Sequence, residues 1–514
     1  MKKFLALLLA LTLAMSLAAC GGDAGGGNSD SKGGSDGSGG SAGKDSLIIA
    51  LDADYQTLHP ANWTTTIERN FDKQIYDSLV GYKVDDESVL EGRVAESWDI
   101  SDDACCYTFH LRDGVTFHNG APVTAKDVEF SLELYANSEA QAGDVQGYDH
   151  CEIVDDQTIK VYTISAFAPF LNNLTLVNIG SKDYFDSVDE ETFAQSPIGC
   201  GAYKFVSHNE GDKTELEAYE DYYMGAPSIK KLTFKVISDM SSMSIGLQSG
   251  QIDFAEIEAP VRSTLEDAEG ITVATADQTT FAFVAMNTEK EPYSNPKFRQ
   301  AVNYALDRQT IITSVMEGNA VENSNLLAHG RFGYSDRQKQ YGYDVDQAKA
   351  LLAECGYPDG LDLGTFIVAD QYKLMAQVVQ ENLKAVGLTC NLEVLEFNAY
   401  LGKLMQGDFG VTCLQMSLEG DTQNVAMAVT KDFIGMANNA RWYNDQVEAW
   451  FAQAVETVDE GERAEIYNDI FSLIQEEAVY AVLYNPTMLF AHNSALTVPD
   501  LPLEGEYRVY DFHW

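Results

Sequence analysis

One loop of this sequence combines polar and aromatic side chains of the kind that face a cleft. Residues 55–63 follow a short apolar run and include Tyr55, His59, Asn62 and Trp63. Amide and hydroxyl groups orient a ligand, while aromatic rings supply apolar area in a pocket that excludes water. We therefore predict that Tyr55, Asn62 and Trp63 contribute to a ligand-binding site.

A second candidate is the tripeptide Arg441-Trp442-Tyr443, in which a guanidinium stands beside two aromatic residues. A guanidinium suits a carboxylate, which it binds through two parallel hydrogen bonds, and aromatic rings suit a sugar ring. A local ion pair would explain Arg441 equally well. Arg441 and Trp442 are the candidate ligand-binding residues of this stretch.

The sequence gives little support for covalent catalysis or for metal binding. Residues 33–37 and 39–43 match the G-x-S-x-G pattern of serine hydrolases, but this Gly/Ser-rich tract offers neither the strand nor the helix that strains the nucleophile's turn. The eight His residues form no H-E-x-x-H motif and have no tight spacing with Cys. We expect no catalytic residue, no metal site and no cofactor.

The charge of the chain excludes several kinds of partner. Lys and Arg number 33 against 79 Asp and Glu, a formal net charge of −46. Such a charge repels phosphate backbones and anionic lipid headgroups, which argues against nucleic acid and against polybasic membrane docking. Hydrophobic residues at 45% and charged residues at 22% describe a globular protein, and 514 residues suit about three compact units.

The N-terminus predicts export and anchoring. A positive start and a short apolar run ending near Met15 predict a signal peptide over residues 1–19, since a membrane span needs ~20 apolar residues. The following Leu-Ala-Ala-Cys resembles the bacterial lipobox, which implies cleavage before Cys20 and a lipid on its sulfur. Residues 20–45, rich in Gly and Ser, predict a flexible tether with a reach of roughly 25–30 Å. We expect an extracytoplasmic protein that meets the cell membrane only through lipidated Cys20.

Strand and helix patterns alternate through the rest of the chain. An apolar run at residues 47–51 and an alternating pattern at 232–236 predict strands. Caps and periodic apolar residues predict helices from residue 296 and over 344–356, 372–386, 445–457 and 462–478, with a strand at 479–484. The mixture indicates an α/β fold with at least two lobes.

The stretch from Trp98 to Leu132 has a well-punctuated pattern. It predicts a strand, an Asp113-Gly114 turn, a second strand, an Asn119-Gly120 turn and a helix. Thr124 and Asp127 have the spacing of a capping box at the start of that helix. Taken alone, the pattern describes a β-β-α unit whose charged residues need no functional role.

The same stretch closely resembles the signature of the extracellular solute-binding proteins of the peptide/nickel class, family 5. Shorter motifs similar to those of the family follow in the family's order along nearly the whole chain. They are Gly199-Cys200-Gly201-Ala202-Tyr203, Tyr222-Tyr223-Met224-Gly225-Ala226-Pro227, and the segments 247–253, 286–288, 298–308 and 343–357. Several weak motifs in one fixed order make the resemblance specific.

The resemblance implies a two-lobed clamp like that of the periplasmic binding proteins. We expect an α/β fold of type II, of the large class with an extra inserted subdomain, in which mixed sheets are flanked by helices. Lobe I would comprise residues 46–85, 200–283 and 490–514, the inserted subdomain residues 86–199, and lobe III residues 284–489.

The resemblance also points to a binding segment at residues 414–422. In peptide-binding relatives an Asp of a Gly-Trp-x-x-Asp-x-x-Asp-Pro-like segment pairs with the α-amine of the ligand. If Asp421 matches the later Asp, Leu418 stands where the amine-binding Asp belongs and Gln415 replaces the Trp. Glu419 or Asp421 remains available for a cationic group, although both acids would fit a solvated loop equally well. The candidate residues here are Gln415, Met416, Glu419 and Asp421.

The segment from Phe283 to Asn287 lies where we expect the first crossing between the lobes, so Phe283 and Asn287 are further candidates for the ligand site.

The function that the resemblance implies is that of the lipid-anchored substrate-binding component of an ABC importer. Closure of two lobes removes a ligand from water without chemistry. We expect a monomer that binds a small solute, most often a peptide or another amine-bearing molecule, and that delivers it to permease subunits. The family resemblance by itself leaves a nickel chelate open as another ligand. The alternatives are a secreted carbohydrate-active hydrolase, which needs two carboxylates ~5–10 Å apart, and a solute receptor for signalling.

Overall fold

The computed structural model describes residues 44–84, 86–418, 420–501 and 505–514. The predicted signal peptide, the predicted lipidation site Cys20 and the tether as far as residue 43 lie outside these residues. Within the described ranges, no helix combines the length and the apolar character that crossing a membrane requires.

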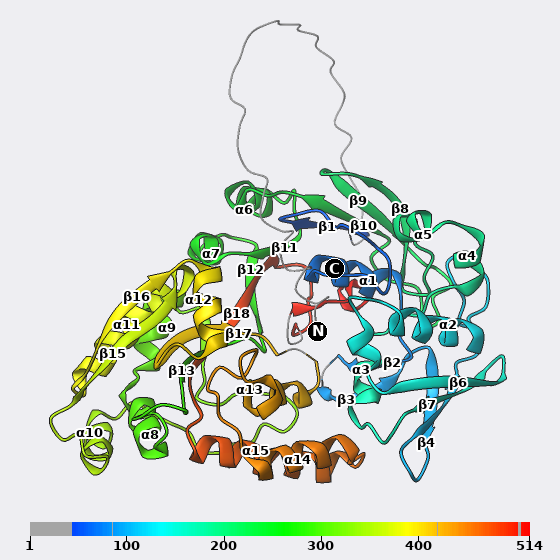
Figure 1. The fold of residues 1–514 in the computed structure, drawn as a ribbon. Helices are drawn as coiled ribbons and strands as arrows, with labels where there is room; N and C mark the ends of the chain where they lie inside the picture. The colour runs from blue at the N-terminus through cyan, green and yellow to red at the C-terminus, as the bar shows by residue number, and fades with distance from the viewer. Residues whose placement is uncertain (1–43, 85, 419, 502–504) are drawn as a thin grey trace, which may run out of the picture. The chain divides into compact units, whose positions relative to one another are not determined.

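A large mixed sheet organises the described chain (Figure 1). Its strands are β1 (Ser46–Leu51), β8 (Tyr203–Asn209), β9 (Lys213–Ala218), β10 (Lys231–Val236), β11 (Phe254–Ile257), β12 (Ile271–Asp277), β13 (Phe281–Met286), β14 (Ala320–Glu322), β15 (Leu361–Ala369), β16 (Leu388–Leu395), β17 (Val411–Met416) and β18 (Tyr480–Asn493). The order is β16-β15-β17-β13-β18-β11-β1-β10-β9-β8, and β12 and β14 also pair with β18. Parallel pairs join β1 to β10 and β11, and β15 to β16 and β17.

The long strand β18 connects two halves of this sheet, which we call the β1 half (β1 and β8–β12) and the β13 half (β13–β17). Residues 487–493 of β18 pair with β12, and residues 480–484 pair with β13. The chain therefore passes between the halves at residues 278–280 and again within β18. The crossing comes before the expected position at Phe283, because Phe283 already pairs with Leu414 inside the β13 half.

A smaller four-stranded sheet, in the order β4-β5-β7-β6, belongs to the segment predicted to be the inserted subdomain. Its strands are β4 (Ala95–Ile100), β5 (Cys106–Leu111), β6 (Tyr148–Asp155) and β7 (Thr158–Thr163), and a separate ribbon pairs β2 (Val80–Lys83) with β3 (Asp86–Gly92). The predicted helix is α2 (Ala125–Ala136), and Thr124 and Asp127 form its capping box. The strand predicted after Asp113-Gly114 is wrong, because only a single bridge, Thr116 with Pro122, forms there.

Helices lie along both sheets. They are α1 (Thr66–Ile75), α3 (Pro169–Asn173), α4 (Lys182–Ser187), α5 (Glu190–Gln195), α6 (Met240–Gln248), α7 (Ala259–Glu266), α8 (Pro296–Ala305), α9 (Arg308–Met316), α10 (Val345–Glu354), α11 (Lys373–Ala385), α12 (Phe397–Gln406), α13 (Ala426–Val429), α14 (Asp445–Glu456) and α15 (Glu460–Glu476). Five predicted helices are confirmed as α8, α10, α11, α14 and α15. The strand predicted at 479–484 runs on to Asn493, because the same apolar strand serves both halves of the sheet.

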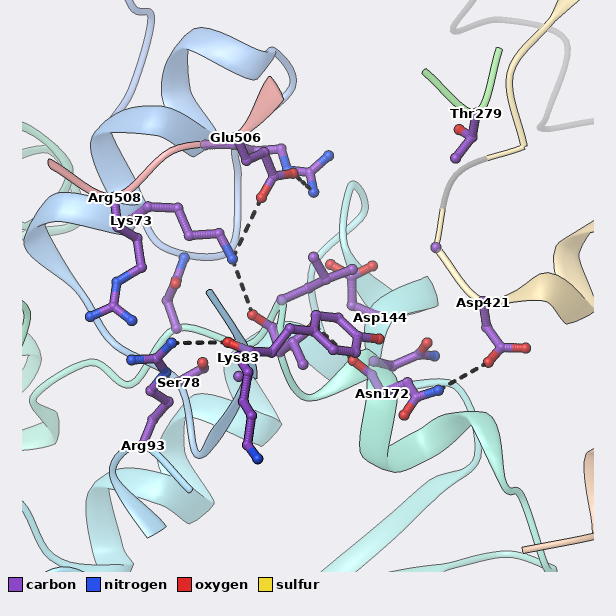
Figure 2. Close-up of a pocket in the computed structure, with 18 of the residues that line it drawn as sticks. Lys73, Ser78, Lys83, Arg93, Asp144, Asn172, Thr279, Asp421, Glu506 and Arg508 are labelled. Carbon is purple, nitrogen blue, oxygen red and sulfur yellow. Dashed lines mark hydrogen bonds and ion pairs between the residues drawn. The ribbon is translucent and has the colours of Figure 1, made fainter. Parts of the chain in front are cut away.

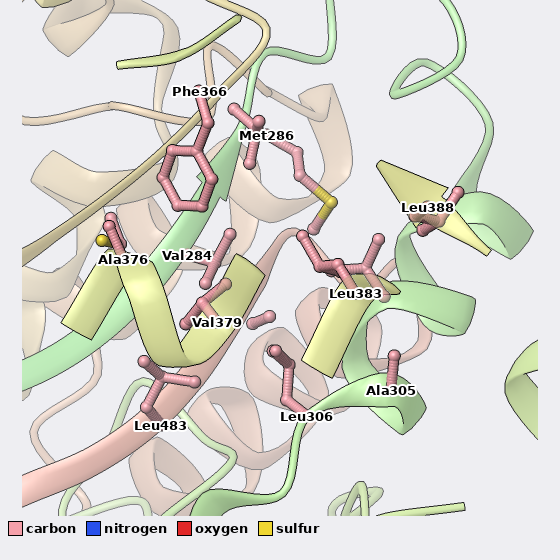
Figure 3. Packing of buried hydrophobic residues seen from close by; sticks show 14 of the residues in the cluster. Val284, Met286, Ala305, Leu306, Phe366, Ala376, Val379, Leu383, Leu388 and Leu483 are labelled. Atoms are coloured by element: carbon pink, nitrogen blue, oxygen red, sulfur yellow. The ribbon is translucent and has the colours of Figure 1, made fainter. Parts of the chain in front are cut away.

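The core of the β13 half shows why these helices form (Figure 3). Asn295 caps α8 by accepting a hydrogen bond from the Lys297 N–H at 3.0 Å, and Pro296 occupies the first helical position. In α11 the apolar residues recur at helical spacing and pack against the sheet. The packed side chains include Ala376, Val379 and Leu383 of α11, Val284 and Met286 of β13, and Phe366 of β15. Together these elements confirm the predicted α/β class, with mixed sheets flanked by helices.

Candidate functional site

A cavity of about 590 Å³ is the candidate site (Figure 2). Its wall is assembled from α1, β2, the segments 143–146 and 167–178, the loops 330–332 and 420–424, and the C-terminal segment 499–512. Residues distant in the sequence therefore meet around one space, whose volume falls within the range typical of small-molecule sites. Figure 2 shows Lys73, Arg93 and Arg508 on one side of this space and Thr279 and Asp421 on the other.

Helix α1 supplies cations to the wall. Thr65 and Glu68 form a reciprocal capping box that starts the helix. Arg69 and Lys73 follow one turn apart, so both side chains lie on the same helix face. The Lys73 Nζ donates to the Thr175 carbonyl at 3.3 Å and lies 3.5 Å from a Glu506 carboxylate oxygen, while Arg69 pairs with the other oxygen of Glu506.

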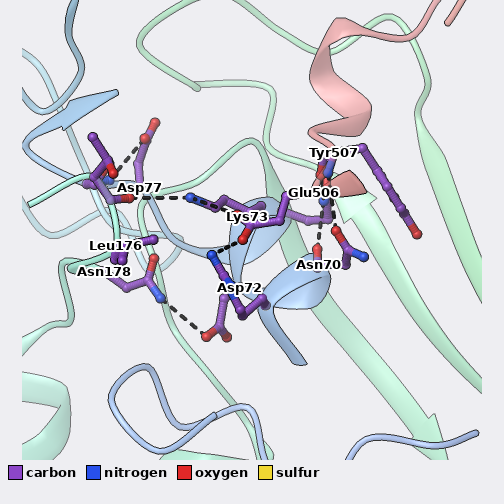
Figure 4. A network of polar contacts seen from close by, with 12 residues as sticks. Asn70, Asp72, Lys73, Asp77, Leu176, Asn178, Glu506 and Tyr507 are labelled. Carbon is purple, nitrogen blue, oxygen red and sulfur yellow. Dashed lines mark hydrogen bonds and ion pairs between the residues drawn. The ribbon is translucent and has the colours of Figure 1, made fainter. Parts of the chain in front are cut away.

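The C-terminal segment is held against α1 by buried amides (Figure 4). The Asn70 side-chain carbonyl accepts from the Tyr507 N–H at 3.2 Å. The Gln74 amide donates to the Tyr507 carbonyl at 2.8 Å and accepts from the Val509 N–H at 2.8 Å. These bonds bring Glu506 and Arg508 to the cavity from the far end of the chain.

The Gly-Cys-Gly motif holds the other end of α1. A Cβ at Gly199 would lie 2.0 Å from the Ile75 carbonyl oxygen, and one at Gly201 would lie 2.6 Å from that of Gln74. The Gly201 N–H donates to the Ile75 carbonyl at 2.9 Å. Only glycine permits this approach of backbone to backbone, so the motif positions α1 and the side chains that α1 carries.

Asp77, a cavity-lining acid, sits in a cluster of polar and charged side chains. The hydroxyls of Tyr222 and Tyr223 each donate to its carboxylate at 2.7 Å. Burial opposes ionisation here, but Arg508 and Arg93 hold the pKa of Asp77 below its ordinary value. The two arginines therefore favour the ionised form of Asp77.

Two other cavity groups have pKa values near neutrality. Burial, together with Arg69 and Arg508, lowers the pKa of Lys73 to about 8. Burial raises the pKa of Asp144 to about 6, against the opposing effect of Arg69 and Lys73. The Asp144 Oδ2 atom is buried and has no hydrogen-bond partner in the described part of the chain. Both groups lie at a site where a ligand's charges would change their protonation.

The wall from the β13 half is built around a buried ion pair. Asp421 pairs with Arg463 at 2.5 Å, and their side chains are 4% and 3% exposed. Burial disfavours the charged form of Arg463, but Asp421 and Tyr467 together raise its pKa. Arg331 donates to the Gly420 and Asp421 carbonyls at 2.9 and 3.1 Å, which fixes the loop. The Asn172 amide, from the opposite wall, donates to Asp421 at 3.4 Å.

Of the residues predicted from the sequence, the structure brings Trp63 and Asp421 to the cavity. The Trp63 ring lies against the Arg69 guanidinium at 4.7 Å, so it also orients that cation. The carboxylate of Asp421 is already paired with Arg463, which leaves it poorly placed to serve as the main partner of a ligand amine. Glu419 lies outside the described residues.

The candidates at the expected crossing are interior residues that do not line the cavity. Phe283 is fully buried and packs edge-on against Tyr480, with ring centroids 5.0 Å apart. The Asn287 amide is fully buried and donates to the Gly407 and Phe409 carbonyls at 3.1 and 3.2 Å. Phe283 lies on β13, an interior strand with core on both faces, and Asn287 directly follows this strand, so both residues stabilise the β13 half.

The remaining candidates also lie away from the cavity. Arg441 forms the ion pair that the sequence left open, with Glu289 at 2.7 Å, and Trp442 is buried in the same core as Phe283. Gln415 donates to the Tyr484 hydroxyl at 3.2 Å, and Met416 packs against that core. Tyr55 packs on Phe71 and His208, and Asn62 accepts a bond from the Ser138 hydroxyl at 3.3 Å.

Sequence reasoning missed the cations of the cavity, which are Arg69, Lys73, Lys83, Arg93, Arg331 and Arg508. One signal was present in the sequence. Arg69 and Lys73 are like charges at positions i and i+4 of a helix, an arrangement that destabilises the helix unless an acid or a ligand offsets the repulsion. In a chain with so few cations, such a pair is a signal for a binding site. The partner Glu506 could not be assigned, because it lies more than 430 residues further along the chain.

The described residues contain neither a metal site nor a disulfide bond. Within them, no group of His, Cys, Asp and Glu side chains is arranged to hold a metal ion. The seven cysteines found there, including Cys105 and Cys106, are not bridged to one another.

Comparison with known proteins identifies the chain's relatives. The family described as bacterial extracellular solute-binding proteins, family 5, middle region, matches residues 89–430. Heme-binding protein A of Haemophilus influenzae is 29% identical over 79% of this chain and 80% of its own length. The dipeptide-binding protein of Escherichia coli is 26% identical over 85% of this chain and 86% of its own length. The solved structure of the ABC transporter substrate binding protein CtaP of Listeria monocytogenes superimposes with a TM-score of 0.79 at 25% identity, covering 91% of this chain and 99% of that one.

These relatives are named as binding proteins rather than enzymes. The family match covers well over half of the chain, and the relatives span most of it. This chain therefore belongs to the bacterial extracellular solute-binding proteins, family 5.

Proposed function

We propose that this protein is the lipid-anchored, extracytoplasmic substrate-binding component of an ABC importer, and that it captures a small solute by closure of its lobes without chemistry. The observation that carries the proposal is the cavity, because its wall combines residues that pack with the β1 half, the β13 half and the four-stranded segment. A ligand in such a space contacts elements that a hinge at residues 278–280 and within β18 would move together.

The proposed ligand is a peptide or another amine-bearing solute, as the name of the dipeptide-binding relative suggests. Asp144 is the acid available for the amine, since its buried Oδ2 has no partner among the described residues. An amine there would also restore the ionised form of a carboxyl whose pKa is raised to about 6. Asp144 thus takes the role first assigned to Asp421.

Native mass spectrometry of the purified protein tests the proposal. We expect a small solute that remains bound and whose mass is unchanged after prolonged incubation, and we expect the protein to copurify with permease subunits when it is isolated from membranes. Steady conversion of the solute to products would instead support the hydrolase alternative.

The lipid anchor needs a test of its own. Mass analysis of the membrane-bound protein should find a diacylglyceryl group on an N-terminal Cys20 and no residues before it. Cys20→Ala should release the protein from the membrane, whereas Cys105→Ala, at a partly exposed free cysteine, should leave it bound. Membrane attachment of Cys20→Ala would refute the anchor.

A further inference from the structure

We infer that the solute taken by the cavity carries carboxylate groups, and that one of them binds between Lys73, Arg93 and Arg508. The inference rests on the proposed function and names the class of ligand for the same site.

The cavity is much richer in cations than the chain as a whole. The whole sequence has 33 Lys and Arg against 79 Asp and Glu, whereas six of each kind line the cavity. The cations are Arg69, Lys73, Lys83, Arg93, Arg331 and Arg508, and the acids are Asp77, Asp144, Asp421, Asp500, Glu506 and Asp511. The surface that meets the ligand is therefore positive relative to its surroundings, in a protein whose net charge would otherwise repel anions.

Two of the acids contribute less negative charge than their number suggests. Asp421 is neutralised by Arg463, a cation that does not itself line the cavity. Burial raises the pKa of Asp144 to about 6, so this carboxyl is partly protonated close to neutral pH. Among the other acids, Asp77 lies close enough to Arg93 and Arg508 for both to lower its pKa, and Glu506 pairs with Arg69 and Lys73. Glu91, which does not line the cavity, pairs with Arg93 at 3.0 Å.

The cations facing Lys73 repel one another, and an anion would relieve that repulsion. Arg69, Arg508 and Arg93 each disfavour the protonated form of Lys73, while Asp77 favours it. Lys73 keeps about a quarter of its side chain exposed, so its ammonium is accessible from the cavity. A carboxylate placed among these groups would gain from all of them, because charge-assisted hydrogen bonds are the strong ones and Arg binds carboxylates through a planar fork.

Lys83 extends the same charge to the rim of the cavity. It is exposed, lines the cavity on β2, and makes no ion pair with any described residue. Trp63, Phe167 and Phe332 supply apolar surface to the wall. The site therefore combines an anion pocket, a free cation at its entrance and aromatic walls for the body of an organic solute.

Calorimetric titration with four probes tests the inference. The probes are the dipeptide alanyl-glutamate with free carboxylates, the same peptide with both carboxylates amidated, inorganic phosphate, and a linear diamine. We expect alanyl-glutamate to bind, to lose affinity as salt is added, and to bind at least tenfold more tightly than its amidated form. Phosphate binding in its place would assign the pocket to phosphate and would overturn the assignment to carboxylates.

Two cavity variants and one matched control locate the binding. Lys73→Met and Lys83→Glu should each weaken alanyl-glutamate by about tenfold or more. Lys83→Glu should leave the melting temperature of the ligand-free protein unchanged, because the Lys83 side chain is exposed and makes no ion pair with any described residue. Lys384→Glu, at an exposed lysine of α11 outside the cavity, makes the same charge change and should leave affinity unchanged.

The outcomes separate this inference from the proposed function. Tighter binding of the amidated peptide or of the diamine would overturn the inference and leave solute capture standing. Unchanged affinity in Lys83→Glu and Lys73→Met would remove the carboxylate from this pocket. Failure of all four probes, together with no copurifying solute in native mass spectrometry, would count against both.

Discussion

Loss of the Asp421 charge should destabilise the fold, rather than only remove a ligand contact. Asp421 and Arg463 are 4% and 3% exposed, with an N–O distance of 2.5 Å. Asp421→Asn leaves the guanidinium buried without its counter-ion, and the Arg463 Nε already has no hydrogen-bond partner among the described residues. Breaking a buried pair from one side costs about 3–5 kcal/mol. We expect a corresponding fall in the urea midpoint, measured by circular dichroism.

A double-mutant cycle checks the physical reason. Asp421→Asn with Arg463→Met removes both buried charges, so the double variant should regain most of the stability, with a coupling of at least about 2 kcal/mol. Glu381→Gln is the surface control, because its pair with Lys384 is more than half exposed on both sides and should change stability by less than ~0.5 kcal/mol. Additive losses in the cycle, or an Asp421→Asn variant as stable as the control, would refute the reasoning.

Gly199→Ala should lower the free energy of unfolding by about 3 kcal/mol or more, because the added Cβ would overlap backbone atoms. Gly402→Ala, inside α12 with open space around the added Cβ, should raise it by about 0.5–1 kcal/mol. Equal melting temperatures of the two variants would contradict this. Burial raises the pKa of Asp72, so ionisation of this carboxyl opposes folding as pH rises above the ordinary carboxyl range. Asp72→Asn should therefore reduce the loss of melting temperature between pH 5 and 8. A pH profile of melting temperature equal to that of the unmodified protein would disprove this prediction. Affinity for an N-acetylated dicarboxylate should fall as pH rises through about 6, where Asp144 ionises, and fall again through about 8, where Lys73 loses its proton. Calorimetry should show that Asp144→Asn lacks the step near pH 6 and that Lys73→Met lacks the step near pH 8.

Local signals explain what was predicted correctly. The Asn295 cap with Pro296 and the box of Thr124 with Asp127 are set by neighbours within a few residues, and the structure has helices starting at both. Several motifs of the family could be recognised for the same reason. Gly199 and Gly201 could be found by motif, but the reason that only glycine fits, the approach of the Ile75 and Gln74 carbonyls, is visible only in the folded chain.

The candidate site was predicted less well because burial and pairing depend on distant segments. Polar and aromatic residues such as Phe283, Asn287 and Trp442 look available in the sequence, yet tertiary packing places them in the core. Asp421 was predicted at the site and lies there, but its charge is taken by Arg463, 42 residues later.

The sequence by itself determined the α/β class, six of the helices and the family, because helix caps, apolar periodicity and short motifs act over a few residues. Only the tertiary structure decided which charges face the cavity. Arg69 and Lys73 come from α1, while Glu506 and Arg508 come from the C-terminal segment, and the buried amides of Asn70 and Gln74 bring the two together. Electrostatic interactions act through space over a few ångströms, and sequence separation carries no information about them.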